Sequence, residues 1–336
     1  MMRLVKQEDI AKMLNISRTT VARALNGNKN IKPETKEKIL NLAEELGYKK
    51  NPISSSLARK KNKNIYAFII ESRNKYYTEK IKAGLKEAET EFSFYGYSIN
   101  IIQTDIETPE KQLIELKKII KEKDVEGIII TPLLKKEIKE IKMQNPQIHF
   151  ITLDIPLDNS IFYVGPNYFK SGRIAAEILI STLQQDEKIL VLDTVDDRIS
   201  SKLYMDGFLS RVKEENTNFI VGPIYSENLM KDIKSILEEY MTTNVKAIYA
   251  TRFLTDIVKY IDNKYNKKMN IIGNGMSEDM KKLIMNKKII ATVIEKCYEE
   301  GYFAGKFMFE KLYKDMENVN NKYIMDSRIV VRETML

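Results

Sequence analysis

The sequence predicts a mixed α/β protein in which a short all-α segment precedes a body built on parallel sheets. Within the first 46 residues, apolar side chains recur at the three- and four-residue spacing of helices. From residue 65 onward, short apolar runs alternate with helical stretches, as in parallel sheets covered by helices. With 336 residues, of which 43% are hydrophobic, the chain is long enough for more than one domain.

Residues 10–26 predict two short helices joined by a tight turn. Asn15 tolerates the left-handed backbone of such a turn, and the Ser17 hydroxyl can cap the second helix. The apolar faces are formed by Ile10, Ala11 and Leu14 in the first helix and by Val21, Ala24 and Leu25 in the second. The opposite face of the second helix carries Arg18, Thr19, Ala22 and Arg23. This face suits the major groove of DNA, but a small helical subdomain with a solvated polar face has the same pattern.

A third helix is expected from Pro33 to Gly47, because proline is tolerated in a first helical turn and glycine commonly ends a helix. Asn51 and Pro52 then allow a very short fourth helix over 52–58, which contains one large apolar side chain, Leu57. A helix this short is marginal in water. We therefore expect it to form when DNA or another partner holds it.

The basic residues are concentrated in this N-terminal segment. Residues 1–63 contain 15 Lys and Arg and 6 Asp and Glu, a net charge of +9, whereas the whole chain carries +8. The remaining 273 residues therefore have a net charge of −1. Such an imbalance attracts phosphate groups and predicts salt-dependent binding to nucleic acid.

Residues 5–58 resemble the DNA-binding headpiece and hinge of the lac/galactose repressor family. The positions that match the family pattern are Ile10-Ala11, Ile16-Ser17, Thr20-Val21, Arg23, Leu25-Asn26, Gly47-Tyr48, Asn51 and Leu57. The chain departs from the pattern at Ala22, Lys50, Ser54 and Ser55, where the family has Ser, Pro, Ala and Arg. These departures leave the implied helix-turn-helix fold intact and affect the contacts of the hinge.

The resemblance implies a role for individual residues. Arg18 and Thr19 occupy the main base-contacting positions and Arg23 a third one, and arginine can bond guanine through two hydrogen bonds. The alternative for both arginines is nonspecific phosphate contact. The implied phosphate contacts are Ser17, Thr20 and Asn26, and the hinge contributes Asn51 and Leu57. Leu57 would enter the minor groove as an apolar wedge, or else pack against its own domain.

The body is expected to continue as alternating strands and helices. The expected strands are 65–70, 97–102, 127–130, 149–153, 161–164, 188–192, 219–224, 246–250, 270–273, 289–293 and 329–331. The expected helices are 78–94, 109–122, 135–143, 167–184, 201–214, 227–241, 254–264, 277–286 and 297–314. Because this is too long for one ordinary sheet, we expect two similar halves.

The body also resembles the same family, through Ser72–Tyr77, Val125–Ile130, Val164–Gly172 and Ile329–Thr334. The resemblance implies two subdomains hinged around a cleft, as in periplasmic sugar-binding proteins. Residues 1–62 would be the DNA-binding headpiece and hinge helix, and 63–336 the effector-binding and dimerisation domain. Its first subdomain would hold about 64–165 and 294–325, and its second about 166–293 and 326–336.

The cleft is where the chain departs most from the family. Tyr204 stands at the family's ligand-binding arginine, Arg252-Phe253 at its Asn-Asp, and Gly273-Asn274-Gly275 at its Gly-Phe-Asp, while Ile155 replaces the arginine after Asp154. The candidate effector-binding residues are Tyr76, Tyr77, Asp154, Arg198, Tyr204, Arg252, Phe253 and Asn274. Arg198 and Arg252 favour an anion such as a sugar phosphate or sugar acid. The alternatives are control by a partner protein, or no ligand and a packed cleft.

Several classes of protein are disfavoured. The chain has one cysteine, Cys297, no apolar signal sequence and no run long enough to span a membrane, so we expect a cytoplasmic protein. The sole histidine, His149, fits a strand, and no cofactor, metal or nucleophile motif is present, so we expect no enzyme activity and no cofactor. Acidic pairs such as Glu299-Glu300 are interpreted as ordinary solvated charges.

We therefore predict a sequence-specific transcription regulator, most simply a repressor. It would bind a pseudo-palindromic double-stranded DNA operator as a homodimer, because one headpiece contacts one half-site. A sugar or sugar derivative in the cleft would alter the angle between subdomains and so the affinity for DNA. The alternatives are a solute-binding sensor with weak nonspecific DNA binding, and a repressor that is effector-independent or controlled by a protein.

Overall fold

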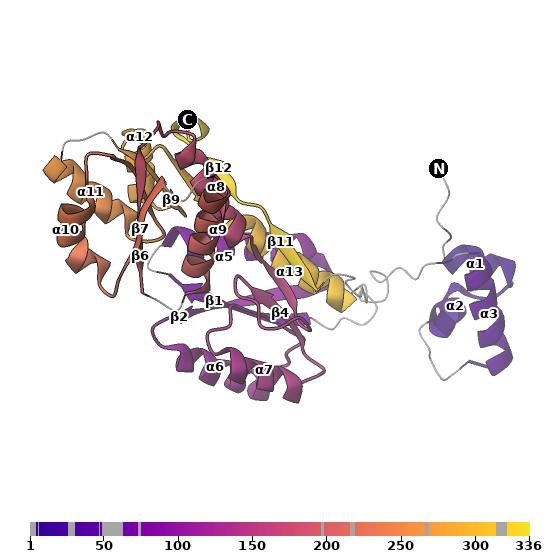
Figure 1. Cartoon of the computed structure of the whole chain (residues 1–336). Coiled ribbons are helices and arrows are strands. Elements are labelled where there is room, and N and C mark those ends of the chain that lie inside the picture. The colour runs from indigo at the N-terminus through magenta and orange to yellow at the C-terminus, as the bar shows by residue number, and fades with distance from the viewer. Residues whose placement is uncertain are drawn as a thin grey trace.

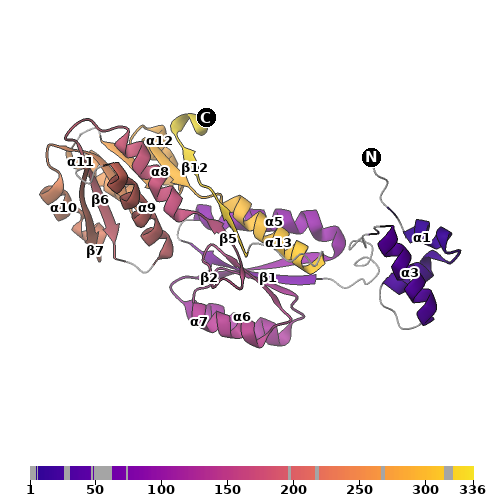
Figure 2. The same ribbon diagram turned by 45° about the vertical axis from the view of Figure 1, so that its right-hand side comes forward.

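The structure is a computed structural model of the chain. It describes residues 5, 7–25, 31–46, 48, 63–72, 75–195, 198–215, 219–265, 269–313 and 321–336. These residues form a helical bundle followed by two six-stranded sheets with helices on both faces (Figures 1 and 2). The predicted α/β fold class with parallel sheets is confirmed.

The N-terminal bundle has its own small core. It contains α1 (Gln7–Met13), α2 (Arg18–Leu25) and α3 (Pro33–Glu45). Asn15 adopts φ 50° in the turn between α1 and α2, and the Thr20 N–H donates to Ser17 Oγ at 3.1 Å, so the expected turn and cap are present. The buried core consists of Ile10, Ala11, Val21, Ala24, Ile39 and Ala43. The predicted helix over 52–58 lies outside the described residues.

The first sheet has the order β11-β5-β4-β3-β1-β2, and every neighbouring pair is parallel. Its strands are β1 (Lys63–Glu71), β2 (Tyr97–Asp105), β3 (Gly127–Ile130), β4 (His149–Leu153), β5 (Phe162–Pro166) and β11 (Lys322–Met325). One face is covered by α6 (Pro109–Glu122) and α7 (Lys135–Gln144), and the other by α5 (Lys75–Phe92) and α13 (Cys297–Tyr313) (Figure 2). The 3-10 helix η1 (Ser93–Tyr95) follows α5.

The second sheet has the order β12-β10-β9-β8-β6-β7. Its strands are β6 (Lys188–Thr194), β7 (Ile220–Ser226), β8 (Val245–Ala250), β9 (Asn270–Asn274), β10 (Ala291–Ile294) and β12 (Arg328–Val330). The pair β10 and β12 is antiparallel, and the other neighbouring pairs are parallel. The helices on its two faces are α8 (Tyr168–Ile180) and α9 (Ile199–Glu215) on one, and α10 (Leu229–Tyr240), α11 (Leu254–Tyr265) and α12 (Glu278–Met285) on the other.

The chain crosses between the two sheets at three places. The crossovers lie between β5 and α8, between β10 and α13, and between β11 and β12. The sequence analysis missed β11, because its four residues, Lys-Tyr-Ile-Met, are largely exposed and form a short edge strand. The predicted boundaries of the DNA-binding segment and of the two subdomains stay predictions.

In each half of the body, two helices pack so closely that their backbones are in contact, namely α5 with α13 and α8 with α9. A Cβ on Gly84 of α5 would lie 2.0 Å from the Tyr298 carbonyl oxygen of α13, and one on Gly301 would lie 2.3 Å from the Ile81 carbonyl oxygen. On the second sheet, a Cβ on Gly172 of α8 would lie 2.0 Å from the Tyr204 carbonyl oxygen of α9. Glycine is therefore required wherever these backbones meet.

Replacing Gly84 by alanine is expected to destabilise the body by about 1–3 kcal/mol, because the added methyl group meets backbone atoms that cannot move independently. Urea unfolding followed by circular dichroism measures this loss. Glu87→Ala, an exposed change on the same helix, is the control and should stay within about 0.5 kcal/mol of the parent. Equal stabilities for the two variants would show that α5 and α13 can separate without cost.

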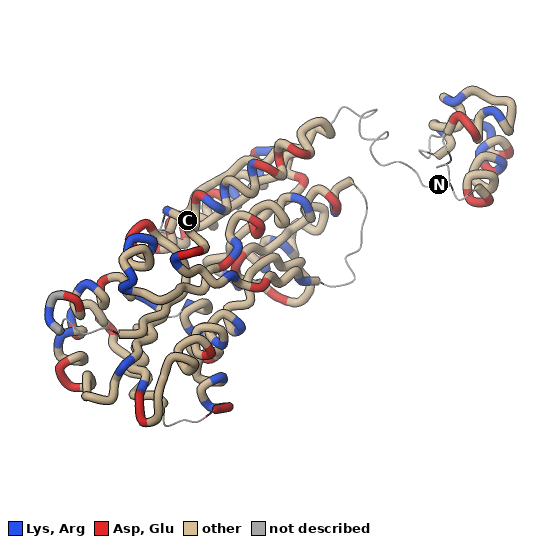
Figure 3. Tube along the Cα trace, turned by 90° about the horizontal axis from the view of Figure 1, so that it is seen from above, with Lys and Arg blue, Asp and Glu red and all other residues tan. Residues whose placement is uncertain are grey.

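Residues of both charges, coloured blue and red in Figure 3, are interspersed along the helices of the body. This distribution agrees with its small net charge of −1 outside residues 1–63. Among the described helices, none has the length and apolar character needed to cross a bilayer.

Candidate functional site

The outer face of α2 is a candidate surface for binding DNA. Val21 and Ala24 are buried against α1 and α3, which directs the other side of the helix outward. Arg18, Thr19 and Arg23 are exposed on that side. Arg18 is 3.5 Å from Glu8 across exposed side chains, a weak ion pair that solvent screens. The arginines are thus available to a duplex.

The start of α2 is held by hydroxyl groups. Besides capping Thr20 N–H, the Ser17 hydroxyl lies 2.8 Å from the Thr20 hydroxyl, and both residues are at the same end of α2 as Arg18. The predicted DNA contacts Asn26, Asn51 and Leu57 lie outside the described residues.

A second candidate site lies where the first sheet meets the crossovers. Asp154 follows β4 with φ 64°, and its N–H donates to the Val164 carbonyl oxygen at 2.9 Å. The Tyr168 hydroxyl, from α8, donates to Asp154 Oδ1. The Tyr163 hydroxyl donates to the Asp154 carbonyl oxygen at 3.1 Å. Tyr77 is partly buried, and the burial of its hydroxyl, together with the nearby Asp154 charge, raises its pKa. Asp154 therefore joins side chains from both halves of the body.

Two further carboxyl groups lie within electrostatic range of Asp154, namely Glu295 and Glu300. We refer to these three residues as the acidic cluster. Glu295 belongs to the crossover between β10 and α13, accepts a hydrogen bond from Tyr204, and lies 3.5 Å from the Ser171 hydroxyl. Glu300, in the first turn of α13, is 1% exposed, and neither of its carboxyl oxygens has a hydrogen-bond partner among the described residues.

Burial dominates the electrostatics of the acidic cluster. It raises the pKa of Glu295 to about 7, and the nearby Asp154 charge adds to this effect while the Tyr204 hydrogen bond opposes it. Burial also raises the pKa of Asp154, against the hydrogen bond from Tyr168. The pKa of Glu300 is raised by burial and then by the charges of Asp154 and Glu295. The site thus resists holding three negative charges at once.

The predicted effector residues of the second half lie at the ends of its strands. Asn274 ends β9 and accepts a hydrogen bond from the Tyr249 hydroxyl at 2.7 Å, while its Nδ2 lacks a partner among the described residues. Phe253, with φ 57°, precedes α11, and the Arg252 guanidinium lies 5.1 Å from its ring centroid. Arg198 is exposed just before α9.

The adjacent residues Tyr76 and Tyr77 have separate environments. Tyr77 faces Asp154, whereas Tyr76 packs against the apolar core of the second sheet. Lys80 and Lys281 lie 5.6 and 5.5 Å from the Tyr76 ring centroid, and they come from α5 and α12 respectively. Tyr76 is therefore a contact between the two halves of the body.

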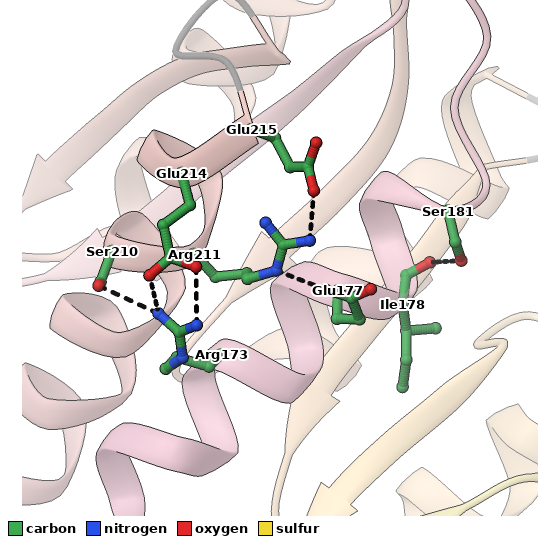
Figure 4. A network of polar contacts seen from close by, with 8 residues as sticks. All are labelled: Arg173, Glu177, Ile178, Ser181, Ser210, Arg211, Glu214 and Glu215. Carbon is green, nitrogen blue, oxygen red and sulfur yellow. Dashed lines mark hydrogen bonds and ion pairs between the residues drawn. The ribbon is translucent and has the colours of Figure 1, made fainter.

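Tyr168 and Tyr204 are placed side by side by the close pair α8 and α9, with their rings T-shaped at 5.1 Å. A surface network also joins these helices (Figure 4). Arg173 donates to both carboxylate oxygens of Glu214 at 2.6 and 2.8 Å, and Arg211 donates to Glu177 and Glu215. Exposed ion pairs add little stability. The close backbone contacts at the glycines therefore do most to fix α8 against α9.

The structure thus brings Tyr77, Asp154 and Tyr204 together, while Arg198, Arg252, Phe253 and Asn274 belong to the second half of the body. The sequence analysis missed Tyr168, Ser171, Glu295 and Glu300. Its interpretation of Glu300 as a solvated charge was wrong. The helical spacing of the sequence indicates this burial, because Glu300 lies three residues after the buried Cys297 and four before the buried Ala304.

The single histidine and the single cysteine of the chain both lie in regular elements of the body. His149 begins β4, as its apolar neighbours predicted, and burial lowers its pKa. Burial raises the pKa of the Cys297 thiol, which disfavours a reactive thiolate. No group of three or more His, Cys, Asp or Glu side chains among the described residues is arranged to hold a metal ion.

Comparison with known families accounts for both parts of the chain. Residues 7–51 match the family model described as bacterial regulatory proteins, lacI family. Residues 66–315 match a model described as a periplasmic binding protein domain. The resemblance inferred from the sequence is confirmed over both segments.

Curated relatives match over much of the chain. Catabolite control protein A of Priestia megaterium is 24% identical over 341 residues, covering 97% of this chain and 98% of its own. The Bacillus subtilis protein named Probable HTH-type transcriptional repressor ExuR is 29% identical over 215 residues, covering 62% of this chain and 60% of its own.

Solved structures show the same fold for the body. A periplasmic ribose ABC transporter protein from Conexibacter woesei has a TM-score of 0.71 at 18% identity, covering 82% of this chain and 93% of its own. The glucose-galactose binding protein GanP from Geobacillus stearothermophilus has a TM-score of 0.66 at 21% identity, covering 82% and 99%. With a lacI-type helix-turn-helix joined to this body, the chain belongs to the lacI family of bacterial regulatory proteins and is a DNA-binding transcriptional regulator.

Proposed function

We propose that the chain is a repressor that binds a pseudo-palindromic operator as a homodimer. The observation that carries this proposal is the outer face of α2, where Arg18, Thr19 and Arg23 are exposed opposite a buried apolar face. One such helix contacts one half-site, so two copies of the chain are needed for a palindrome. Residues 1–62 would supply the DNA contacts, including Asn26, Asn51 and Leu57.

Residues 63–336 would bind a small polar effector, a sugar or a sugar derivative, and form the dimer. Among the described residues, the Glu300 carboxyl oxygens and the Asn274 Nδ2 atom lack hydrogen-bond partners, which supports a polar ligand, because buried polar groups are normally paired. The relatives named catabolite control protein A and ExuR are regulators by their names, and the latter is named a repressor. The effector would change the angle between the halves and so the affinity for DNA.

Deletion of the gene in its host, combined with chromatin immunoprecipitation of the tagged protein, tests the proposal. Transcripts from genes next to the bound sites are expected to increase in the deletion strain and to return to normal on complementation. A decrease in those transcripts would indicate an activator. Binding spread evenly over the chromosome would support the alternative of a sensor with weak nonspecific DNA binding.

A further inference from the structure

The acidic cluster has no cationic partner among the described residues. Among the described residues, no lysine or arginine forms an ion pair with Asp154, Glu295 or Glu300, and both Glu300 oxygens are without a partner. The Asp154 N–H faces Glu300, but it already donates to the Val164 carbonyl oxygen. A carboxyl group that is 1% exposed and unpartnered costs free energy, which makes it a candidate for pairing with a ligand.

The acidic cluster also belongs to both halves of the body. Asp154 directly follows β4 of the first sheet, Glu300 lies on α13, which covers that sheet, and Glu295 lies in the crossover. Tyr168, Ser171 and Tyr204, whose hydroxyls bond or face these carboxyl groups, come from α8 and α9 on the second sheet. A ligand bound here would therefore contact the two halves whose relative angle the effector is proposed to set.

The surroundings favour a cationic organic group. Tyr77, Tyr163, Tyr168 and Tyr204 lie around the carboxyl groups, and burial raises the pKa of each, so the phenols stay neutral. Neutral aromatic rings beside carboxylates stabilise ammonium groups through their electron-rich faces. The described residues do not provide the arrangement of ligands that a metal ion requires. An ammonium group makes less strict geometric demands.

Space for the rest of such a ligand lies next to the cluster. A cavity of about 200 Å³ is lined by Glu295, Cys297, Tyr76 and Tyr298. It is larger than the roughly 30 Å³ that one water molecule occupies in the liquid, so it has room for several non-hydrogen atoms. Lys80, Lys296 and Arg328 also line the cavity and are exposed, and Glu295 is the member of the acidic cluster that lines it.

We infer that the effector carries a primary amino group and that the acidic cluster binds it as an ammonium ion. This inference rests on the proposed control by a small effector and specifies its chemical class. An amino sugar or another polyhydroxylated amine satisfies it. Because Glu295 must be ionised to pair with the ammonium group, binding of ethanolamine, whose ammonium group stays protonated over this range, should strengthen by about tenfold from pH 6 to pH 8.

Thermal unfolding of the full-length protein in matched small molecules tests this inference. The probes are D-glucosamine with D-glucose, and ethanolamine with ethylene glycol, together with D-glucuronate. At pH 8 we expect the amines to raise Tm by about 2–4 °C at saturating concentration and the neutral partners to leave it unchanged. Failure of both amines, an equal effect of their neutral partners, or stabilisation by glucuronate instead would overturn the inference. The last result would support an anionic effector bound through Arg198 and Arg252.

Variants connect the response to the acidic cluster. Glu300→Gln keeps the side-chain shape and should abolish the amine response, whereas Glu310→Gln, later on the same helix, should retain it. If Glu300→Gln does not fold, Glu295→Gln serves in its place, with the same expected loss. An amine response that persists in both cluster variants would overturn the assignment. Operator binding measured on the same samples is independent of this result, so failure of the amine site and failure of the regulator proposal are distinguishable.

Discussion

Replacing both Arg18 and Arg23 by alanine is expected to abolish discrimination between operator and unrelated DNA, a loss of about 2–6 kcal/mol. Each arginine that forms two hydrogen bonds to guanine contributes about 1–3 kcal/mol of preference over the wrong base pair. Both side chains are exposed on α2 while Val21 and Ala24 hold the helix in place, so the bundle should stay folded. Fluorescence anisotropy with operator and scrambled duplexes measures the two affinities.

The matched control removes the same charge from other parts of the bundle. Lys12 on α1 and Lys38 on α3 are exposed, and their joint replacement by alanine should weaken binding to both duplexes similarly. If the arginine variant also weakens both duplexes equally, Arg18 and Arg23 contact phosphates and do not contact bases.

Replacing Glu295 by glutamine is expected to stabilise the protein at pH 8 by up to about 4 kcal/mol and to flatten the dependence of its stability on pH. Burial raises the pKa of Glu295 to about 7, whereas a glutamate in an unfolded chain has a pKa of about 4.3. Between these values the folded protein binds more protons than the unfolded chain. The contribution of Glu295 to the free energy of unfolding therefore decreases as pH rises from about 4 to about 7 and is constant above that range.

Chemical denaturation at a series of pH values from 4.5 to 8 measures this effect. The raised pKa values of Asp154 and Glu300 act in the same direction and should leave a residual slope in the variant. Glu140→Gln, an exposed change on α7, should keep the profile of the parent. A parent protein whose stability rises over this range would contradict the burial of the acidic cluster.

Most of the fold follows from patterns that are local in the sequence. The helical spacing of Ile10, Val21 and Ile39 produces the bundle, and the apolar runs 127–130 and 149–153 become fully or mostly buried central strands. By contrast, β11 is a largely exposed strand of four residues. It is a strand because it pairs with β5, which comes from a distant part of the chain. No local pattern specifies that pairing.

The same distinction explains why the DNA-binding face could be predicted from the sequence and the acidic cluster could not. The DNA-binding face is contained within one helix, so spacing and residue type predict which side chains are exposed. The acidic cluster depends on tertiary packing, since Asp154, Glu295 and Glu300 come together through β4, a crossover and α13. Glu300 lies on the buried face of its helix, and its charge made a solvated position the natural expectation. At this position, helical spacing predicts burial better than residue type does.

Selection of bound sequences from random duplex DNA by the purified full-length protein, at about 0.15 M salt, tests the central claim most directly. Enrichment of a palindrome with two half-sites, lost in the Arg18 and Arg23 variant, is the result that a dimeric sequence-specific regulator predicts. Salt-sensitive binding without enrichment of any sequence, both with and without cell metabolites, would contradict it.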